Sequence, residues 1–110
     1  MAEFHTARIR ELNDRARQAF IGSRVVITQG IAGLDEHVTY AILAQVRSYD
    51  SFTPDNDPHG EHDFGSFHNG AVQVFWRWDH YDLDYSMHSM DPADDTVTAR
   101  VLTIMLAEEY

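Results

Sequence analysis

FGSFHNGAVQVFWRW, residues 64–78, is the stretch that decides the fold. Asn69 and Gly70 separate two aromatic-rich runs, and this dipeptide suits a two-residue type I′ turn because both positions need a positive φ. We therefore predict an antiparallel hairpin in which Gly65 pairs with Val74. The core face of this hairpin would carry Phe67, Val72, Val74, Trp76 and Trp78.

Helical periodicity precedes the hairpin. Apolar residues recur at helical spacing over residues 6–20 and again over residues 35–47, where Asp35 could cap the helix. Between these segments, the β-branched run at residues 25–28 predicts a buried strand. The chain therefore begins with a helix, a strand and a second helix.

Two more elements are predicted after the hairpin. Alternating apolar and polar residues over 81–86 are typical of a half-buried edge strand. Asp94 or Asp95 would cap a final helix, dense in apolar residues, which ends near Glu108. The order α-β-α-β-β-β-α predicts a single α+β domain over residues 1–110, with three helices on one face of a small, mostly antiparallel sheet of three to four strands.

The charge of the chain is uneven. Residues 1–49 contain five acidic residues and six arginines, whereas residues 50–110 contain thirteen acidic residues and two arginines, so that +1 and −11 sum to the formal net charge of −10. Such a chain repels nucleic acid and attracts basic surfaces. The one basic cluster is predicted to be a solvated helix face; it consists of Arg8, Arg10, Arg15 and Arg17.

Composition also limits the site chemistry and the compartment. The chain has no cysteine, which excludes disulfides and thiolate metal sites. Its N-terminal region mixes charges through the apolar positions, unlike a signal peptide or a membrane span. We therefore expect a soluble protein of the cytoplasm.

The segment DNDPHGEHDFG, residues 55–65, concentrates acids and histidines. As a calcium loop it has Ser66 where a bidentate glutamate is needed. As a transition-metal site it places His62 and Asp63 on opposite faces of a strand. We therefore predict neither a metal site nor a cofactor.

The same segment allows an acid-base interpretation and a structural one. A carboxylate beside His62 or His80 would raise the pKa of the imidazole, but no nucleophile or catalytic motif accompanies these histidines. In the structural interpretation, Asp63 accepts a hydrogen bond from the Trp76 indole and His62 faces solvent. The role of Glu61, His62 and Asp63 stays undecided between the two.

The aromatic run of the second half exceeds what one face of a small sheet can bury. Phe75, Tyr81 and Tyr85 are expected to stay exposed beside carboxylates, a composition typical of protein-binding surfaces. The acids expected to share this surface are Asp55, Asp57, Glu61, Asp79, Asp82 and Asp84.

Several segments, taken in order, resemble one family: NDRARQAF, RVVITQGIAGL, FTPDNDPHGEHDFG, FWRWDHYD, DPADD and VLTIMLAEEY. The family consists of small alphaproteobacterial proteins of unknown function, and Glu61, His62 and Asp63 match its EHDFG motif as they stand. The resemblance covers nearly the whole chain and includes the C-terminal segment that we interpret as a helix. It implies a cytoplasmic protein, often carried on plasmids and other mobile elements, without an established activity.

We therefore expect an acidic protein-binding module of a mobile element. It would inhibit a host nucleic-acid-directed defence system, of the anti-CRISPR or antirestriction type, by occupying a basic surface. Direct contact with nucleic acid or with a membrane is not expected. The alternatives are a small metal-assisted hydrolase with His62 and Asp63 at its site, and a homodimeric regulatory module whose aromatic sheet face is its own interface.

Overall fold

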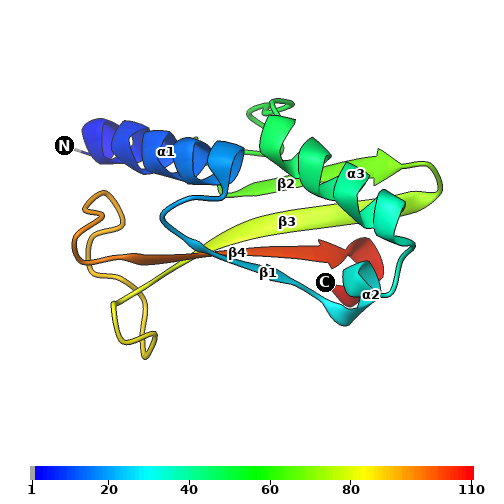
Figure 1. Cartoon of the computed structure of the whole chain (residues 1–110). Coiled ribbons are helices and arrows are strands. Elements are labelled where there is room, and N and C mark those ends of the chain that lie inside the picture. The colour runs from blue at the N-terminus through cyan, green and yellow to red at the C-terminus, as the bar shows by residue number, and fades with distance from the viewer. Residues whose placement is uncertain (1) are drawn as a thin grey trace.

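A computed structural model describes residues 2–110 (Figure 1). Its elements are α1 (Ala2–Ala19), β1 (Arg24–Ile27), α2 (Gln29–Ala32), α3 (Glu36–Ser48), β2 (Phe64–Asn69), β3 (Val72–Tyr81), β4 (Ala99–Leu106) and the 3₁₀ turn η1 (Ala107–Glu109). Three α-helices and a four-stranded sheet confirm the predicted α+β class. No helix within the described residues is both long and apolar enough to cross a membrane.

The four strands follow the order β1-β4-β3-β2. β1 runs parallel to β4, whereas the β4-β3 and β3-β2 pairs are antiparallel. The two long helices, α1 and α3, lie over the same face of this sheet, while α2 lies near its end (Figure 1). The sheet therefore has one helix-covered face and one open face.

The core lies between the helices and the covered face. Trp76 and Trp78 of β3 are buried there beside Leu102 and Ile104 of β4, with Ile42 of α3 packed against them. Burial of this alternate set of β3 residues confirms the predicted core face of the hairpin. Of the remaining members of that face, Val74 is fully buried in the same cluster, and Phe67 and Val72 are partly buried and pack against it.

The register of the hairpin differs from the prediction by two residues. Gly65 pairs with Trp76, not with Val74, and the turn consists of Gly70 and Ala71. Only Gly70 has a positive φ, of 58°, which is the pattern of a type II′ turn and not of type I′. Because side chains alternate with a period of two, this shift leaves every residue on its predicted face.

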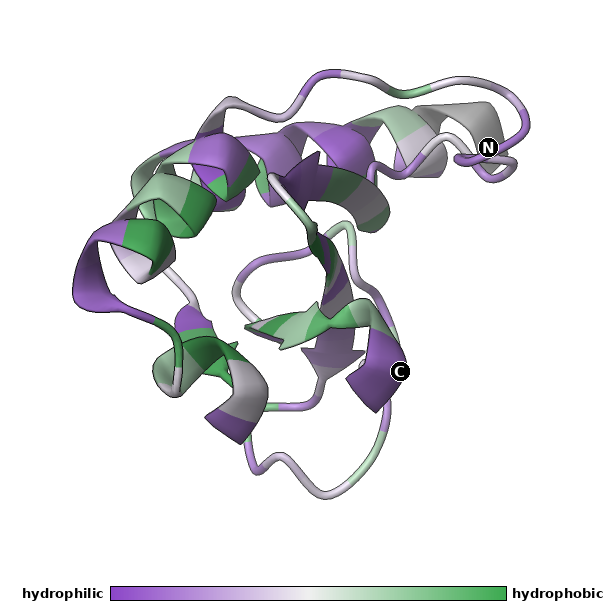
Figure 2. Ribbon diagram, turned by 90° about the vertical axis from the view of Figure 1, so that its right-hand side faces the viewer, coloured by the Kyte–Doolittle hydropathy of each residue, from purple (hydrophilic) through white to green (hydrophobic). Residues whose placement is uncertain are grey.

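The C-terminal helix predicted from Asp94 or Asp95 to Glu108 is wrong. Residues 99–106 form β4, a central strand paired with both β1 and β3. The part of β4 that leads into the C-terminal turn is coloured as hydrophobic in Figure 2. Residues from both of its faces are buried, so its apolar run has no alternation, and periodicity alone cannot tell such a strand from a buried helix.

The edge strand predicted over residues 81–86 is also wrong. β3 ends at Tyr81, and residues 82–98 form a long loop before β4. The carboxylate of Asp82 accepts hydrogen bonds from the backbone N and the Oγ of Ser86, at 2.9 and 3.0 Å, which closes a turn. Local side-chain bonds of this kind compete with strand pairing.

The N-terminal elements lie where they were predicted apart from their ends, but the prediction that β1 is buried is wrong, because it is an edge strand with three of its four residues exposed. α1 begins at Ala2, before the expected residue 6, and β1 covers residues 24–27. Asp35 occupies the N-cap position of α3, although its side chain makes no capping hydrogen bond. The short helix α2 was not predicted, since four residues are too few to show a helical period.

Candidate functional site

Asn13 ties α1 to the end of the sheet where β3 ends and β4 begins. Its fully buried side chain accepts hydrogen bonds at Oδ1 from His80 Nε2, at 2.9 Å, and from Arg100 Nε, at 3.1 Å. Its Nδ2 donates to the backbone oxygen of Glu61 at 3.0 Å. One amide thus joins four segments of the chain, and each of its polar atoms has a partner.

His80 is a neutral member of this network. Burial lowers the pKa of His80 to about 4, and the positive charge of Arg100 acts in the same direction. The prediction of a raised pKa for His80 is therefore wrong. The neighbouring Asp79 lies on the opposite face of β3 and pairs with Arg77 Nε at 3.2 Å, so it does not orient this imidazole.

Arg17 of α1 is also part of the interior. Its side chain is 1% exposed, and its guanidinium donates to the backbone oxygen of Val46 at 2.7 Å and to Asp14 at 3.2 Å. The guanidinium carbon lies 5.0 Å from the Trp76 ring and 5.6 Å from the Phe52 ring. The solvated face predicted for the α1 arginines is therefore wrong for this residue, which binds helix to sheet.

The other three arginines of α1 lie nearer the surface. Arg8 pairs with Glu11 at 3.1 Å, and Arg10 donates to the backbone oxygen of Gly60 at 3.0 Å. Arg15 is exposed. Of these three, Arg8 thus pairs within α1, and Arg10 joins α1 to the loop before β2.

His62 joins α1 to the loop before β2. Its Nδ1 lies 2.9 and 3.0 Å from the two carboxylate oxygens of Asp14, and its Nε2 lies 3.6 Å from Oδ2 of Asp57. The ring stacks on Phe52, with 3.6 Å between centroids and 3° between planes. The prediction that His62 faces solvent is wrong, because both ring nitrogens face carboxylates.

The backbone at His62 is strained. Its φ is 52°, which a residue with a side chain rarely adopts. Its N–H donates to Oδ1 of Asp57 at 3.2 Å, so the carboxylate that faces the ring also holds the main chain. These contacts offset the strain and fix the entry to β2.

Asp63 acts through its backbone and not through the predicted side-chain bond. Its carbonyl oxygen accepts a hydrogen bond from the Trp78 N–H at 2.8 Å, which extends the β2-β3 pairing by one position. The indole nitrogen of Trp76 has no hydrogen-bond partner in the described part of the chain. The expected bond between Asp63 and Trp76 is therefore absent.

Carboxylates gather around Asp63 at this end of the sheet. Burial raises the pKa of Asp63, and the nearby charges of Asp57 and Asp79 act in the same direction. Burial likewise raises the pKa of Glu61, and the nearby charge of Asp63 acts in the same direction to a smaller extent. The structure thus brings together four of the acids that the sequence analysis singled out.

Packing explains why Gly65, the last residue of the EHDFG segment, is a glycine. A Cβ at this position would lie 2.3 Å from Nε1 of the paired residue Trp76. Any side chain would displace the indole from the core. The glycine is therefore required by packing against a tryptophan eleven positions away.

The remaining predicted acids lie in two loops. Asp55 and Asp84 are exposed, and Asp82 is half-buried. The hydrogen bonds from Ser86 lower the pKa of Asp82. Asp82 and Asp84 belong to the 82–98 loop, which leaves the same end of the sheet as the carboxylate group around Asp63.

Most acids of the second half lack a cationic partner, whereas most arginines are engaged. Of the thirteen acidic residues at 50–110, three lie within ion-pair distance of an arginine or a histidine among the described residues, which leaves ten without one. The three are Asp57, Asp79 and Asp95. Seven of the eight arginines contact a carboxylate, a carbonyl or an aromatic ring: Arg8, Arg10, Arg17, Arg24, Arg47, Arg77 and Arg100.

The open face of the sheet carries an aromatic cluster. Phe75 of β3 lies 5.3 Å from Phe64 of β2 and 5.4 Å from Tyr110, measured between ring centroids, with edge-to-face geometry. Phe75 and Phe64 are half-buried, and Tyr110 is 73% exposed. Sequence reasoning found Phe75 but missed the other two rings, because their meeting depends on β2 and the chain end reaching one place.

A second pair of rings lies farther along this face. Tyr81, at the end of β3, is half-buried and lies 6.2 Å from Tyr85 of the following loop. Tyr85 is 43% exposed and receives the Arg24 guanidinium over its ring at 4.3 Å. All three predicted aromatic residues thus lie on or beside the face that the helices leave uncovered.

A hollow of about 370 Å³ borders His62. Its walls include Phe52, Asp57 and His59. Among the residues that the structure describes, no group of three or more His, Asp or Glu side chains is arranged to hold a metal ion.

A family model described as a protein of unknown function (DUF3768) matches residues 27–109. The chain belongs to this family. The match includes the EHDFG segment, the hairpin and β4, whereas Asn13, Asp14 and Arg17 of α1 precede it. No curated protein and no solved structure matches the chain. Membership in DUF3768 brings no activity with it, so a function must be argued from the surface of this molecule.

Proposed function

We propose that this protein is an acidic binding module that occupies a basic surface of another protein. The observation that carries the proposal is that acidic and basic side chains differ in how many are engaged by other parts of the fold. Among the described residues, ten carboxylates of the second half lack a cationic partner, while seven of the eight arginines are engaged in the fold. A partner rich in arginine or lysine would complete the missing pairs.

The open face supplies the apolar part of such an interface. Phe75, Tyr81 and Tyr85 present ring surface there, and carboxylates of the 82–98 loop border it. Aromatic anchors surrounded by charge are typical of the residues that dominate binding energy. The unpaired carboxylates would speed association, since opposite charge steers encounter.

The internal contacts divide the predicted partner-binding acids into two groups. Asp57 is buried against His62, and Asp79 is paired with Arg77, so neither is free for a partner. The carboxylates assigned to the partner are Asp55, Glu61, Asp82 and Asp84.

The finer form of the proposal concerns the partner. Proteins that bind nucleic acid present arginine and lysine to phosphates, and a surface of carboxylates competes for the same groups. We propose that the partner is a host nucleic-acid-directed defence protein, of the CRISPR or restriction type. The protein would then act for a mobile element, in the cytoplasm, by blocking access of nucleic acid.

The test combines capture with competition. The tagged protein is used to recover partners from nuclease-treated lysate of its host at low and high salt, and the recovered partner is purified. We expect a nucleic-acid-binding protein whose recovery falls with salt and whose nucleic-acid binding is reduced by the added protein. Asp84→Asn should weaken this competition about threefold, as expected for an exposed ion pair.

Asp50→Asn is the matched control, because Asp50 is also exposed and forms no ion pair among the described residues, but it lies just after the end of α3 and is not among the carboxylates assigned to the partner. It should compete as the unmodified protein does. Recovery that is insensitive to salt, or a partner that does not bind nucleic acid, would contradict the proposal. So would a stable dimer in solution that Phe75→Ser dissociates, because the open face would then be occupied by a second copy.

The hydrolase alternative receives no support from the geometry. Both ring nitrogens of His62 face carboxylates, and the Asp63 side chain does not contact this ring. A general base needs a nitrogen free to accept a proton from substrate.

A further inference from the structure

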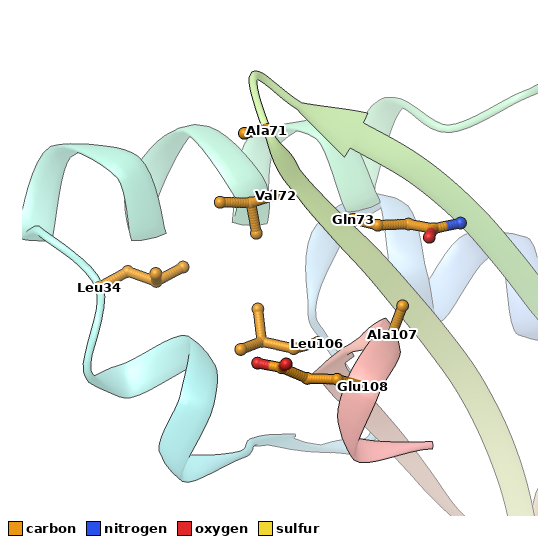
Figure 3. A pocket seen from close by; sticks show the side chains of 7 residues that line it. All are labelled: Leu34, Ala71, Val72, Gln73, Leu106, Ala107 and Glu108. Carbon is orange, nitrogen blue, oxygen red and sulfur yellow. The ribbon is translucent and has the colours of Figure 1, made fainter.

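A second surface, away from the open face, has the composition of a binding site. A hollow of about 480 Å³ lies between the α2-α3 turn, the hairpin turn and the end of β4. The side chains of Leu34, Val72 and Leu106 approach one another from these three elements, and Glu108 lies at the margin (Figure 3). Each of the three apolar side chains is only half-buried.

Glu109 fixes the wall that carries Glu108. Its carboxylate accepts hydrogen bonds from Thr28 Oγ1 at 2.6 Å, from the Leu106 N–H at 2.8 Å and from the Gly30 N–H at 3.1 Å. These bonds lower the pKa of Glu109 and hold η1 against α2. Glu108, one residue earlier, is exposed and has no ion pair among the described residues.

A similar hollow lies on the other side of Leu34. It has a volume of about 330 Å³, and its walls include Leu43 and Tyr40 of α3, the latter 63% exposed. Glu36 borders it and, within residues 2–110, also lacks an ion pair. Leu34 is therefore a shared wall between two apolar hollows, each with an unpaired glutamate.

We propose that these two hollows bind a short basic segment of a partner protein, with an aliphatic residue in each hollow and arginine or lysine side chains on Glu108 and Glu36. The apolar walls fit aliphatic groups and the stems of long cationic side chains, while the carboxylates receive the cationic ends. The inference rests on the proposed function in one respect, that the partner is basic. It adds a second contact, on an end of the molecule that the open face does not include.

Charge complementarity favours this occupant over the alternatives. A second copy of the chain carries a net charge of −10 and would bring more carboxylates to Glu36 and Glu108. A neutral apolar molecule would desolvate the margins of both hollows without pairing either glutamate. A basic segment covers the leucines and neutralises the glutamates together.

The probe is the capped peptide acetyl-Arg-Leu-Arg-Leu-Arg-amide, titrated into the isotope-labelled full chain and followed by amide chemical shifts. We expect the largest shifts at Leu34, Val72 and Leu106, with smaller changes at Phe75 on the open face. Glu108→Gln should weaken peptide binding about threefold, the effect of one exposed ion pair. Asp50→Asn removes the same charge just beyond the end of α3, at an exposed residue assigned to neither proposed surface, and should change the affinity by less than half of that factor.

Two control peptides separate shape from charge. Replacement of both leucines by glycine should reduce affinity more than tenfold, because the apolar hollows would stay empty. Replacement of the arginines by glutamate should abolish binding. Equal affinity of the leucine and glycine peptides, equal effects of Glu108→Gln and Asp50→Asn, or shifts confined to the open face would each overturn the inference.

The outcomes also separate this inference from the proposed function. If the captured partner responds to salt and to Asp84→Asn while the peptide leaves Leu34 and Leu106 unchanged, the second contact is wrong and the acidic module stands. If the peptide binds at Leu34 and responds to Glu108→Gln while no nucleic-acid-binding partner is captured, the hollows are confirmed as a site and the proposed function fails.

Discussion

The polar and charged groups on the two faces of the sheet differ in whether they have partners within the fold. On the covered face, Asn13, Arg17, His80 and Arg100 are at most 6% exposed, and each is hydrogen-bonded to a partner in another element or in the loops. Around the open face, carboxylates such as Asp84 are exposed and form no ion pair among the described residues. The guanidinium groups thus hold the fold together, and the carboxylates are left for whatever the protein binds.

The largest effect expected from this comparison is at Gly65, on the covered face. Gly65→Ala places a Cβ against the Trp76 indole and should lower the free energy of unfolding by more than about 4 kcal/mol. Gly70→Ala is the control, since a Cβ there has nothing within 4 Å and meets only the strain of a positive φ, about 1 kcal/mol. Urea unfolding measures both, and similar losses would show that the covered face is not tightly packed at Gly65.

The hairpin shows which part of this fold follows from local sequence. Its existence and its faces were predictable, because alternation with a period of two is visible in residues 64–78 and survives a register shift of two. β4 was not predictable in the same way. Residues on both faces of β4 are buried, and its apolar run therefore lacks the alternation that would distinguish a strand from a helix.

The residues of the candidate site also differ in how far their surroundings could be predicted from the sequence. That Asp55 and Asp84 would be exposed was predictable, since carboxylates stay at the surface unless a specific partner draws them in. The partners of Asn13 and His62 were not, because His80 and Asp14 lie 67 and 48 residues from them in the chain. No local pattern indicates pairs that only the packing of α1 brings together.

The buried His80 is expected to have an effect of intermediate size, on the pH dependence of the free energy of unfolding. Because the folded pKa of His80, about 4, lies below the unfolded value of 6.5, the unfolded chain binds more protons between these values. The stabilisation is complete above pH 6.5 and is lost as pH falls toward 4, up to about 3 kcal/mol for this group alone. Unfolding free energies at several pH values measure the slope.

Two groups oppose this slope, and a variant isolates the histidine. Glu61 and Asp63 have raised pKa values, so their protonation favours the folded state at the acidic end of the window. His80→Gln should remove the part of the pH dependence between 4 and 6.5 that comes from the imidazole, while His68→Gln, at an exposed position, should leave the profile unchanged. An unchanged profile in His80→Gln would mean that the imidazole is not held neutral.

The smallest expected effect is at the boundary between the two faces, where Asp63 is half-buried near Asp57 and Asp79. Its raised pKa means that ionisation costs more in the folded than in the unfolded state, so the cost is present above the folded pKa and absent at acid pH. Asp63→Asn should therefore raise the unfolding free energy at pH 7 by less than about 1 kcal/mol, with solvent screening included, and leave it unchanged in acid. Thermal melts at both pH values compare this variant with Asp84→Asn, where a fully exposed carboxylate should give no gain. A loss of stability in Asp63→Asn would mean that the ionised carboxylate stabilises the fold. Asp63 would then belong with the buried polar groups of the covered face and not with the exposed acids.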